Sequence, residues 1–265
     1  MRSACLGFTA HAAIGSRAIT RSTPFRWLLA GVAVCTVLTA WIFPPFLFFA
    51  DAGTRAALIA SNTFLWATAY AFLILPMPAS RVLGRDTVVF GRLAPTPTWA
   101  WVSGRFVGLT LPFLVAALVI VGIGSGLAAL LGGEARRADF AVELVHGAAG
   151  QLLVGAVAIS GVAVLSQAGN PILAAVGGVI WFLAGAQKAA VLEGIGSPAL
   201  TAVASIALAW LPDLTLFPVG LNADTTDAAS PWLQLAYALL IMTLNLAITA
   251  IWAECRWRRA TPRRP

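Results

Sequence analysis

Charged side chains are scarce in this sequence of 265 residues: 10% of the residues are charged and 60% are apolar. Soluble domains usually carry about 25% charged residues, so this composition cannot cover a water-facing surface and excludes an ordinary soluble enzyme. A disordered chain is excluded as well, because it needs low hydrophobicity and high charge. Three cysteines, one of them in an apolar run, do not make a disulfide scaffold. These absences together indicate a polytopic membrane protein.

Catalytic motifs are also missing. The sequence has no Gly-x-Ser-x-Gly, no His-Glu-x-x-His, no Cys-x-x-Cys and no phosphate-binding loop ending in Lys-Ser/Thr. Glu143 and His146 have the spacing of half a di-metal site, but the only other histidine, His11, falls in a different region. We therefore expect no catalytic residues, no metal, no cofactor of its own and no nucleotide hydrolysis by this chain alone.

Ionisable groups are almost absent from the apolar runs. No acid falls at a predicted midplane, so a proton relay is not expected. Lys188 lies about 24 Å along its predicted helix, close enough to the membrane surface for its side chain to snorkel. Tyr70, Gln151 and Asn245 are the polar side chains that could line a path. The net charge of +7 comes from residues between the apolar runs, which does not favour nucleic-acid binding.

Intervals without charge locate the membrane spans, because about 20 apolar residues cross the roughly 30 Å hydrocarbon core. Four intervals of 24, 25, 28 and 26 uncharged residues each predict one helix: 27–50, 56–80, 106–133 and 228–253. A fifth interval, 144–187, has 44 residues and contains the turn-like sequence Ser166-Gln-Ala-Gly-Asn-Pro171. It predicts two helices joined by a short loop. The fold expected is therefore all-α, with six transmembrane helices.

The uncharged interval 194–212 is long enough to be a seventh span, and charge decides against it. With six spans and the amino terminus inside, thirteen of the seventeen basic residues lie on the inner side, and eight of the ten acids lie outside. A seventh crossing would put the arginine-rich tail opposite the arginine-rich head, against the positive-inside bias. We therefore expect 193–231 to hold an outer re-entrant helical segment and a loop, with Ser197-Pro198 as a helix start.

Both termini are expected in the cytoplasm, which makes the chain a multi-pass protein of the cell membrane with a single domain over 1–265. Residues 1–26 mix apolar residues with arginines, which suits a helix lying along the inner membrane surface, although a disordered basic leader is an equal alternative. A cleaved signal peptide is disfavoured because the first apolar run is too long. Residues 254–265 form the basic cytoplasmic tail.

The predicted inner loop, residues 78–105, is much longer than the turn between the fourth and fifth helices. Loops of this length are usually functional or disordered. Apolar residues at helical spacing over 82–93 argue against disorder, and Pro95 and Pro97 then prevent helix continuation. Trp99 and Trp101 follow, before Gly104 and Arg105 open the third span. This order predicts a short amphipathic helix, a stiff break and an aromatic shoulder; a helix resting on the lipid surface is the alternative.

This loop resembles the inner-loop pattern of type-2 ABC exporter permeases. The resemblance rests on Arg85-Asp86, Gly91-Arg92-Leu93, Pro95 and the stretch WAWVSGRFVG at 99–108, and it extends to the basic leader, the six spans and the re-entrant segment. The sequence departs from the family where Arg92 stands in place of a frequent Thr, and where Thr96-Pro97-Thr98 stands in place of a frequent Val-Ser-Arg.

The resemblance implies a permease that pairs with a second copy, or a related permease, and with two separate ATPase subunits that bind the ATP. The family's coupling helix would correspond to 79–93 and dock on the ATPase. The residues implied in this coupling are Arg85, Asp86, Arg92, Pro95, Pro97, Trp99, Trp101, Gly104 and Arg105. Membrane lipid is the other expected partner.

Two alternatives remain open at this stage. One is a membrane scaffold or assembly subunit that transports nothing. The other is an ion-coupled carrier or a membrane enzyme, which the lack of midplane acids disfavours. The sequence does not identify a substrate.

Overall fold

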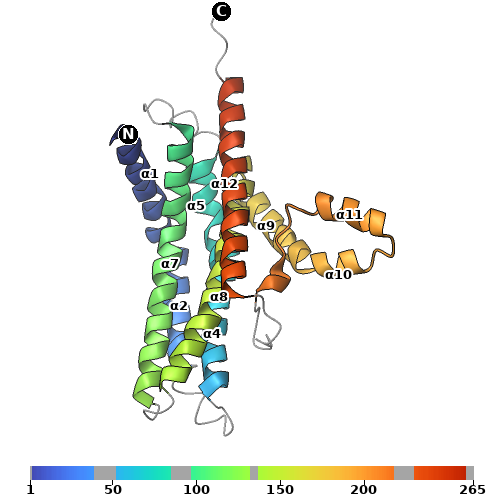
Figure 1. Cartoon of the computed structure of the whole chain (residues 1–265). Coiled ribbons are helices and arrows are strands. Elements are labelled where there is room, and N and C mark those ends of the chain that lie inside the picture. The colour runs from blue at the N-terminus through green and yellow to red at the C-terminus, as the bar shows by residue number, and fades with distance from the viewer. Residues whose placement is uncertain (1, 39–51, 85–96, 132–136, 218–229, 261–265) are drawn as a thin grey trace, which may run out of the picture.

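A computed structural model of the chain shows a bundle of helices (Figure 1). The structure describes residues 2–38, 52–84, 97–131, 137–217 and 230–260, and these contain no β-strand. The α-helices are α1 (Arg2–Thr20), α2 (Thr23–Val37), α4 (Ala52–Ala69), α5 (Pro76–Leu83), α7 (Thr98–Leu131), α8 (Arg137–Leu165), α9 (Pro171–Ala186), α10 (Lys188–Glu193), α11 (Pro198–Ala207) and α12 (Pro231–Ala260). The all-helical prediction is confirmed for this part of the chain.

Three of these helices, α7, α8 and α12, are long and apolar enough to cross a membrane. The segments Ile59–Ile74 and Pro76–Leu83 count as a fourth span if the bent pair is taken together. Apolar α2 and α9 have 15 and 16 residues, and the predicted first span continues into 39–50, outside the described residues. A membrane protein with several apolar helices is therefore supported, and six crossings stay a prediction.

The second predicted span bends where prolines interrupt it. A π-helical turn, Tyr70–Ile74, follows α4, and the Leu75 amide donates to the carbonyl oxygen of Tyr70 at 2.9 Å. Pro76 has no amide hydrogen and its ring crowds the preceding turn, so the helix changes direction by 50° at this point. Helix α5 then ends at Leu83, and Gly84 is its C-cap.

The loop predicted at 78–105 is shorter in the structure than the sequence indicated. Helix α7 begins at Thr98, so Trp99 to Arg105 are helical, and the amides of Ala100 and Trp101 donate to the carbonyl oxygen of Pro97. Proline blocks continuation of a helix from its N-terminal side but is compatible with a helix start, which explains the difference. Since 79–83 also belong to α5, the connecting segment is reduced to 84–97.

The turn predicted between the fourth and fifth helices is confirmed. A short 3₁₀ turn, Ser166–Ala168, is followed by Gly169 with φ of +76°, a left-handed conformation that costs glycine little. Asn170 then caps α9, because its Oδ1 accepts hydrogen bonds from the amides of Ile172 at 2.9 Å and Leu173 at 3.2 Å.

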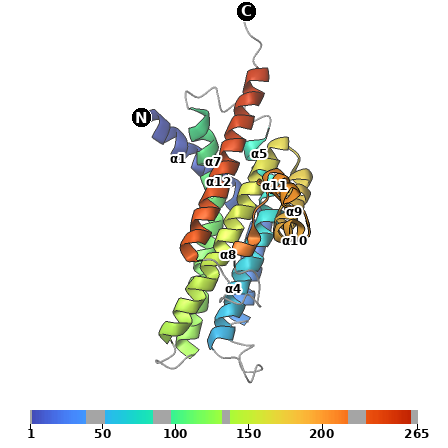
Figure 2. The ribbon, with the colours of Figure 1, turned by 45° about the vertical axis from the view of Figure 1, so that its right-hand side comes forward.

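Helices α9, α10 and α11 form a branch that leaves the bundle sideways (Figures 1 and 2). No residue of α10 or α11 is buried, whereas α9 buries Trp181 and Phe182. Helix α12 starts beside the base of this branch and runs back to the end of the bundle where α1 begins. The start of α1 and the end of α12 thus lie at the same end of the bundle, which agrees with an even number of membrane crossings. The side of the membrane on which this end lies stays a prediction.

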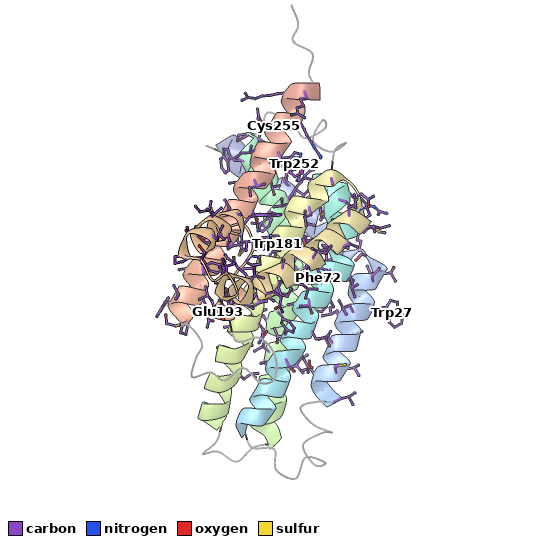
Figure 3. All side chains as sticks on the ribbon, turned by 90° about the vertical axis from the view of Figure 1, so that its right-hand side faces the viewer. Trp27, Phe72, Trp181, Glu193, Trp252 and Cys255 are labelled. Atoms are coloured by element: carbon purple, nitrogen blue, oxygen red, sulfur yellow. The ribbon has the colours of Figure 1, made fainter. Side chains whose placement is uncertain are left out.

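The core is aromatic on the side of α2, α4 and α7. The rings of Phe25 and Trp66 have centroids 5.8 Å apart, those of Trp66 and Tyr70 5.7 Å, and those of Tyr70 and Phe113 5.4 Å. Outward-facing positions are apolar as well, for example Trp27 on α2 (Figure 3). Apolar residues on both the packed and the outer faces are typical of helices surrounded by lipid.

Candidate functional site

The candidate site is the end of the bundle where α1 begins, α5 ends, α7 begins and α12 ends, which we call the terminal end (Figure 1). The segment 84–97 connects α5 and α7 there. Of the residues predicted to couple to an ATPase, Arg85, Asp86, Arg92 and Pro95 lie outside the described residues. The structure describes the other five: Pro97, Trp99, Trp101, Gly104 and Arg105.

Arg105 connects the two ends of this segment. Its side chain is buried, and Nη1 donates a hydrogen bond to the carbonyl oxygen of Val82, in the last turn of α5. The guanidinium carbon also lies 4.3 Å from the centroid of the Trp101 ring, one turn earlier in α7. A charge-assisted hydrogen bond contributes about 1.5–3 kcal/mol. We call these two contacts of Arg105, with Val82 and with Trp101, the Arg105 clamp. The clamp couples the position of α5 to that of α7.

Trp101 and Gly104 face α1 rather than solvent. The Trp101 ring meets His11 edge-on, with centroids 6.4 Å apart. A Cβ added to Gly104 would lie 2.6 Å from the carbonyl oxygen of Phe8, so the two backbones touch at this position. Trp99 and Pro97 are exposed, Trp99 by 61%, which suits an aromatic anchor at the membrane surface.

Helix α1 packs along the first turns of α7 through glycines. A Cβ on Gly108 would lie 2.1 Å from the carbonyl oxygen of Ala12, and one on Gly15 would lie 2.7 Å from that of Arg105. His11, Gly15 and Ile19 are buried at four-residue spacing, which puts them on one face of α1. Residues 2–20 are thus a helix fixed to α7, and not a disordered leader.

Three buried polar atoms in this contact have no hydrogen-bond partner: His11 Nδ1, Trp101 Nε1 and Arg105 Nε. Burial lowers the pKa of His11 from 6.5, and the positive charge of Arg105 lowers it further. The neutral imidazole is therefore the form that packs between α1 and α7.

The end of α12 holds two other segments in place. Thr98 Oγ1, at the start of α7, donates to Glu254 Oε2 at 2.8 Å, and Arg256 donates to the carbonyl oxygen of Gln167 in the turn before α9. These pairs are 156 and 89 residues apart in the sequence. Sequence reasoning missed them because no local pattern marks a contact over such distances.

An open recess of about 590 Å³ lies between the end of α5 and the turn before α9. Its described lining is Met77, Ser80, Arg81, Gly84, Ala168, Gly169 and Pro171. The recess adjoins Gly84, where the connecting segment starts.

The three predicted pathway residues are all buried, and two of them belong to separate clusters. Tyr70 donates from its hydroxyl to the carbonyl oxygen of Leu109 within the aromatic core. Asn245 on α12 donates from Nδ2 to Ser160 Oγ at 2.7 Å and accepts from Trp210 Nε1 at 3.1 Å. Gln151 is buried on α8.

The Asn245 cluster fixes the base of the sideways branch. Trp181 Nε1 donates to the carbonyl oxygen of Trp210 at 3.1 Å, and the two indole rings are 5.7 Å apart. Lys188 Nζ donates to the carbonyl oxygen of Leu211 at 3.4 Å, and its reach to the membrane surface stays a prediction. The buried amide of Asn245 therefore connects α12 to α8 and to the base of the branch through hydrogen bonds.

Among the described residues, no group of three or more His, Cys, Asp or Glu side chains could hold a metal ion. The side chains of Glu143 and His146 lie outside the described part. Comparison with models of known protein families finds no match, and none of the curated proteins matches the chain.

Proposed function

We propose that this chain is the membrane-spanning permease subunit of an ATP-driven exporter. In this proposal it forms the substrate path together with a second copy or a related permease, and two separate ATPase subunits supply the energy. The observation that carries the proposal is the Arg105 clamp, which connects both ends of the segment that resembles a coupling loop.

The clamp gives a mechanical route from a docked ATPase to the spans. Ala79, Val82 and Leu83 of α5 are buried, so α5 cannot shift without moving its neighbours. Arg105 ties α5 to α7, and the glycine contacts tie α7 to α1. A displacement of 84–97 would therefore move α5, α7 and α1 together. Such a rigid-body movement could change the side of the membrane to which the substrate path opens.

In this proposal the energy source is a second chain, and the lack of a phosphate-binding loop in the sequence agrees with it. The basic residues of 84–97 and of the tail would lie on the cytoplasmic side of the cell membrane under the positive-inside rule. A cytosolic ATPase would meet them there.

The test is purification of the tagged chain from detergent-solubilised membranes of its source cell. We expect a stoichiometric ATP-hydrolysing subunit and vanadate-sensitive ATPase activity. The double variant Arg85→Ala/Asp86→Ala should lose the subunit. The control Arg137→Ala/Asp139→Ala makes the same charge change at the start of α8 and should retain it. A monodisperse preparation with no ATPase, or equal retention by both double variants, would overturn the proposal.

A further inference from the structure

The last turns of α12 carry a second hollow, separate from the recess at α5. It has a volume of about 500 Å³, and its described lining is Ile248, Ile251, Trp252, Cys255, Arg256 and Arg259. These positions recur every three or four residues, so they share one face of the helix. We call this face the α12 groove. Figure 3 shows Trp252 and Cys255 at this end of α12.

The α12 groove is apolar at one end and basic at the other, with Trp252 between the two parts. It covers eleven residue steps from Ile248 to Arg259, or about 16 Å along the helix. One leaflet of a bilayer core is about 15 Å thick, half of the roughly 30 Å total. A phospholipid held upright against α12 would thus place its chains on the isoleucines and its phosphate at the arginines.

The acidic residue of this region does not face the groove. At 100° per residue, Glu254 lies far from the line joining Ile248, Cys255 and Arg259. Its carboxylate is engaged elsewhere: Oε2 accepts from Thr98 at 2.8 Å and Oε1 lies 3.4 Å from Arg258 Nε. The two groove arginines therefore keep their positive potential on this face.

The basic end of the groove is partly organised before any ligand arrives. Arg256 donates to the carbonyl oxygen of Gln167 and lies 5.2 Å from the Trp252 ring centroid, which fixes the direction of its side chain. Arg259 is exposed one turn further on. A fixed guanidinium beside a movable one can bind a phosphate group from two sides.

We propose that the α12 groove binds an anionic phospholipid, with its phosphate between Arg256 and Arg259 and an acyl chain along Ile248 and Ile251. Charge complementarity and the match to one leaflet favour a lipid. The groove is also continuous with the exposed apolar face of α12, including Leu240, Leu244 and Ile251, which a bilayer would cover with acyl chains. The inference requires a membrane-embedded α12 and does not rest on the proposed transport function.

Arg258 provides a matched control for Arg259. Both are exposed arginines in the last turn of α12, but Arg258 lies beside Glu254 and outside the groove. The variants Arg259→Gln and Arg258→Gln therefore change the net charge equally. Only the first removes a groove residue, and neither removes the contact of Arg256 with Gln167.

The experiment is native mass spectrometry of the purified full-length chain, titrated in detergent with phosphatidylglycerol or phosphatidylcholine. We expect tighter binding of phosphatidylglycerol, and about a fivefold loss of its affinity in Arg259→Gln, the usual effect of one basic residue near an anionic lipid. Arg258→Gln should change the affinity less than twofold, and Arg259→Lys should restore most of it.

Three results would overturn the inference. Equal affinity for both lipids would show that the phosphate charge is not recognised. Equal losses in Arg258→Gln and Arg259→Gln would show diffuse attraction to the basic tail. Displacement of the lipid by a soluble acidic peptide, with the affinity for the peptide lost in Arg259→Gln, would identify the groove as a protein-binding surface instead.

Discussion

The packing of α1 on α7 predicts the effect of a single methyl group. In Gly108→Ala the new Cβ would lie 2.1 Å from the carbonyl oxygen of Ala12 and within 3.0 Å of two further backbone atoms of that residue. Ordinary contact begins near 3.4 Å. Because backbone cannot rotate away as a side chain can, α1 must withdraw by about 1.3 Å, the difference between 3.4 and 2.1 Å.

The free energy follows from the overpacking of this contact, which costs about 1–3 kcal/mol. The higher helix propensity of alanine does not offset this cost, because α7 is helical whether or not α1 is docked. The docking of α1 should therefore weaken by about 1–3 kcal/mol, which raises the population of detached α1 roughly 5- to 150-fold. In a membrane protein this detachment would be local, since the remaining spans keep their contacts.

Limited trypsin digestion measures this detachment, because exposed Arg17 on α1 and Arg21 just after it should resist cleavage while the helix is docked. Gly108→Ala should be cut faster there than the unchanged protein. Gly122→Ala in the same helix is the control, since nothing lies within 4 Å of a Cβ at that position. Equal cleavage rates for the two variants and the unchanged protein would refute the close packing of α1 on α7.

Three further predictions concern the other contacts of the bundle. Asn245→Leu leaves Ser160 and Trp210 without their hydrogen bonds to the amide, so the free energy of unfolding in detergent should fall by about 1–3 kcal/mol. An unchanged midpoint of thermal unfolding would contradict the stabilising role of Asn245. Because burial lowers the pKa of His11, α1 docking should be complete above its ordinary pKa of 6.5 and weaken as the pH falls below it. Trypsin itself slows in acid, so the cleavage rate is divided by that of His11→Leu at the same pH; this ratio should rise between pH 7.5 and 5.5, and a constant ratio would contradict the role of His11. Arg105→Met removes the hydrogen bond to Val82, so a co-purified ATPase should remain bound while substrate-stimulated ATP hydrolysis falls at least tenfold; full stimulation would show that the clamp does not transmit movement.

The sequence was most informative where one dominant effect operates. Absence of charge located α7, α8 and α12, because an ionised group inside a bilayer is costly whatever its neighbours are. The Gly-Asn-Pro turn before α9 was also predicted, since each of its residues has a local conformational role. The helical state of 98–103 was missed, because a proline that ends one helix can equally precede the next.

Contacts between distant residues were out of reach of such local patterns. Arg105 was expected at the site from a family resemblance, but its bond to Val82 depends on the 50° bend after α4. The burial of His11 depends on the close approach of α1 to Gly104 and Gly108 of α7, a contact that no local pattern in the sequence predicted. Asn245 was expected to line a path, and its bonds to Ser160 and Trp210 show a structural role that only the fold brings about.

The most direct test of the proposed coupling is site-specific cross-linking from the segment between α5 and α7. A photoreactive amino acid placed at Phe90 in the full chain, in its native membrane, should form an adduct with a nucleotide-binding polypeptide from the cytosolic side. The same group at Ala228, in the predicted outer loop, should form none. An adduct from Phe90 only to lipid, or to a protein on the outer side of the membrane, would contradict the account.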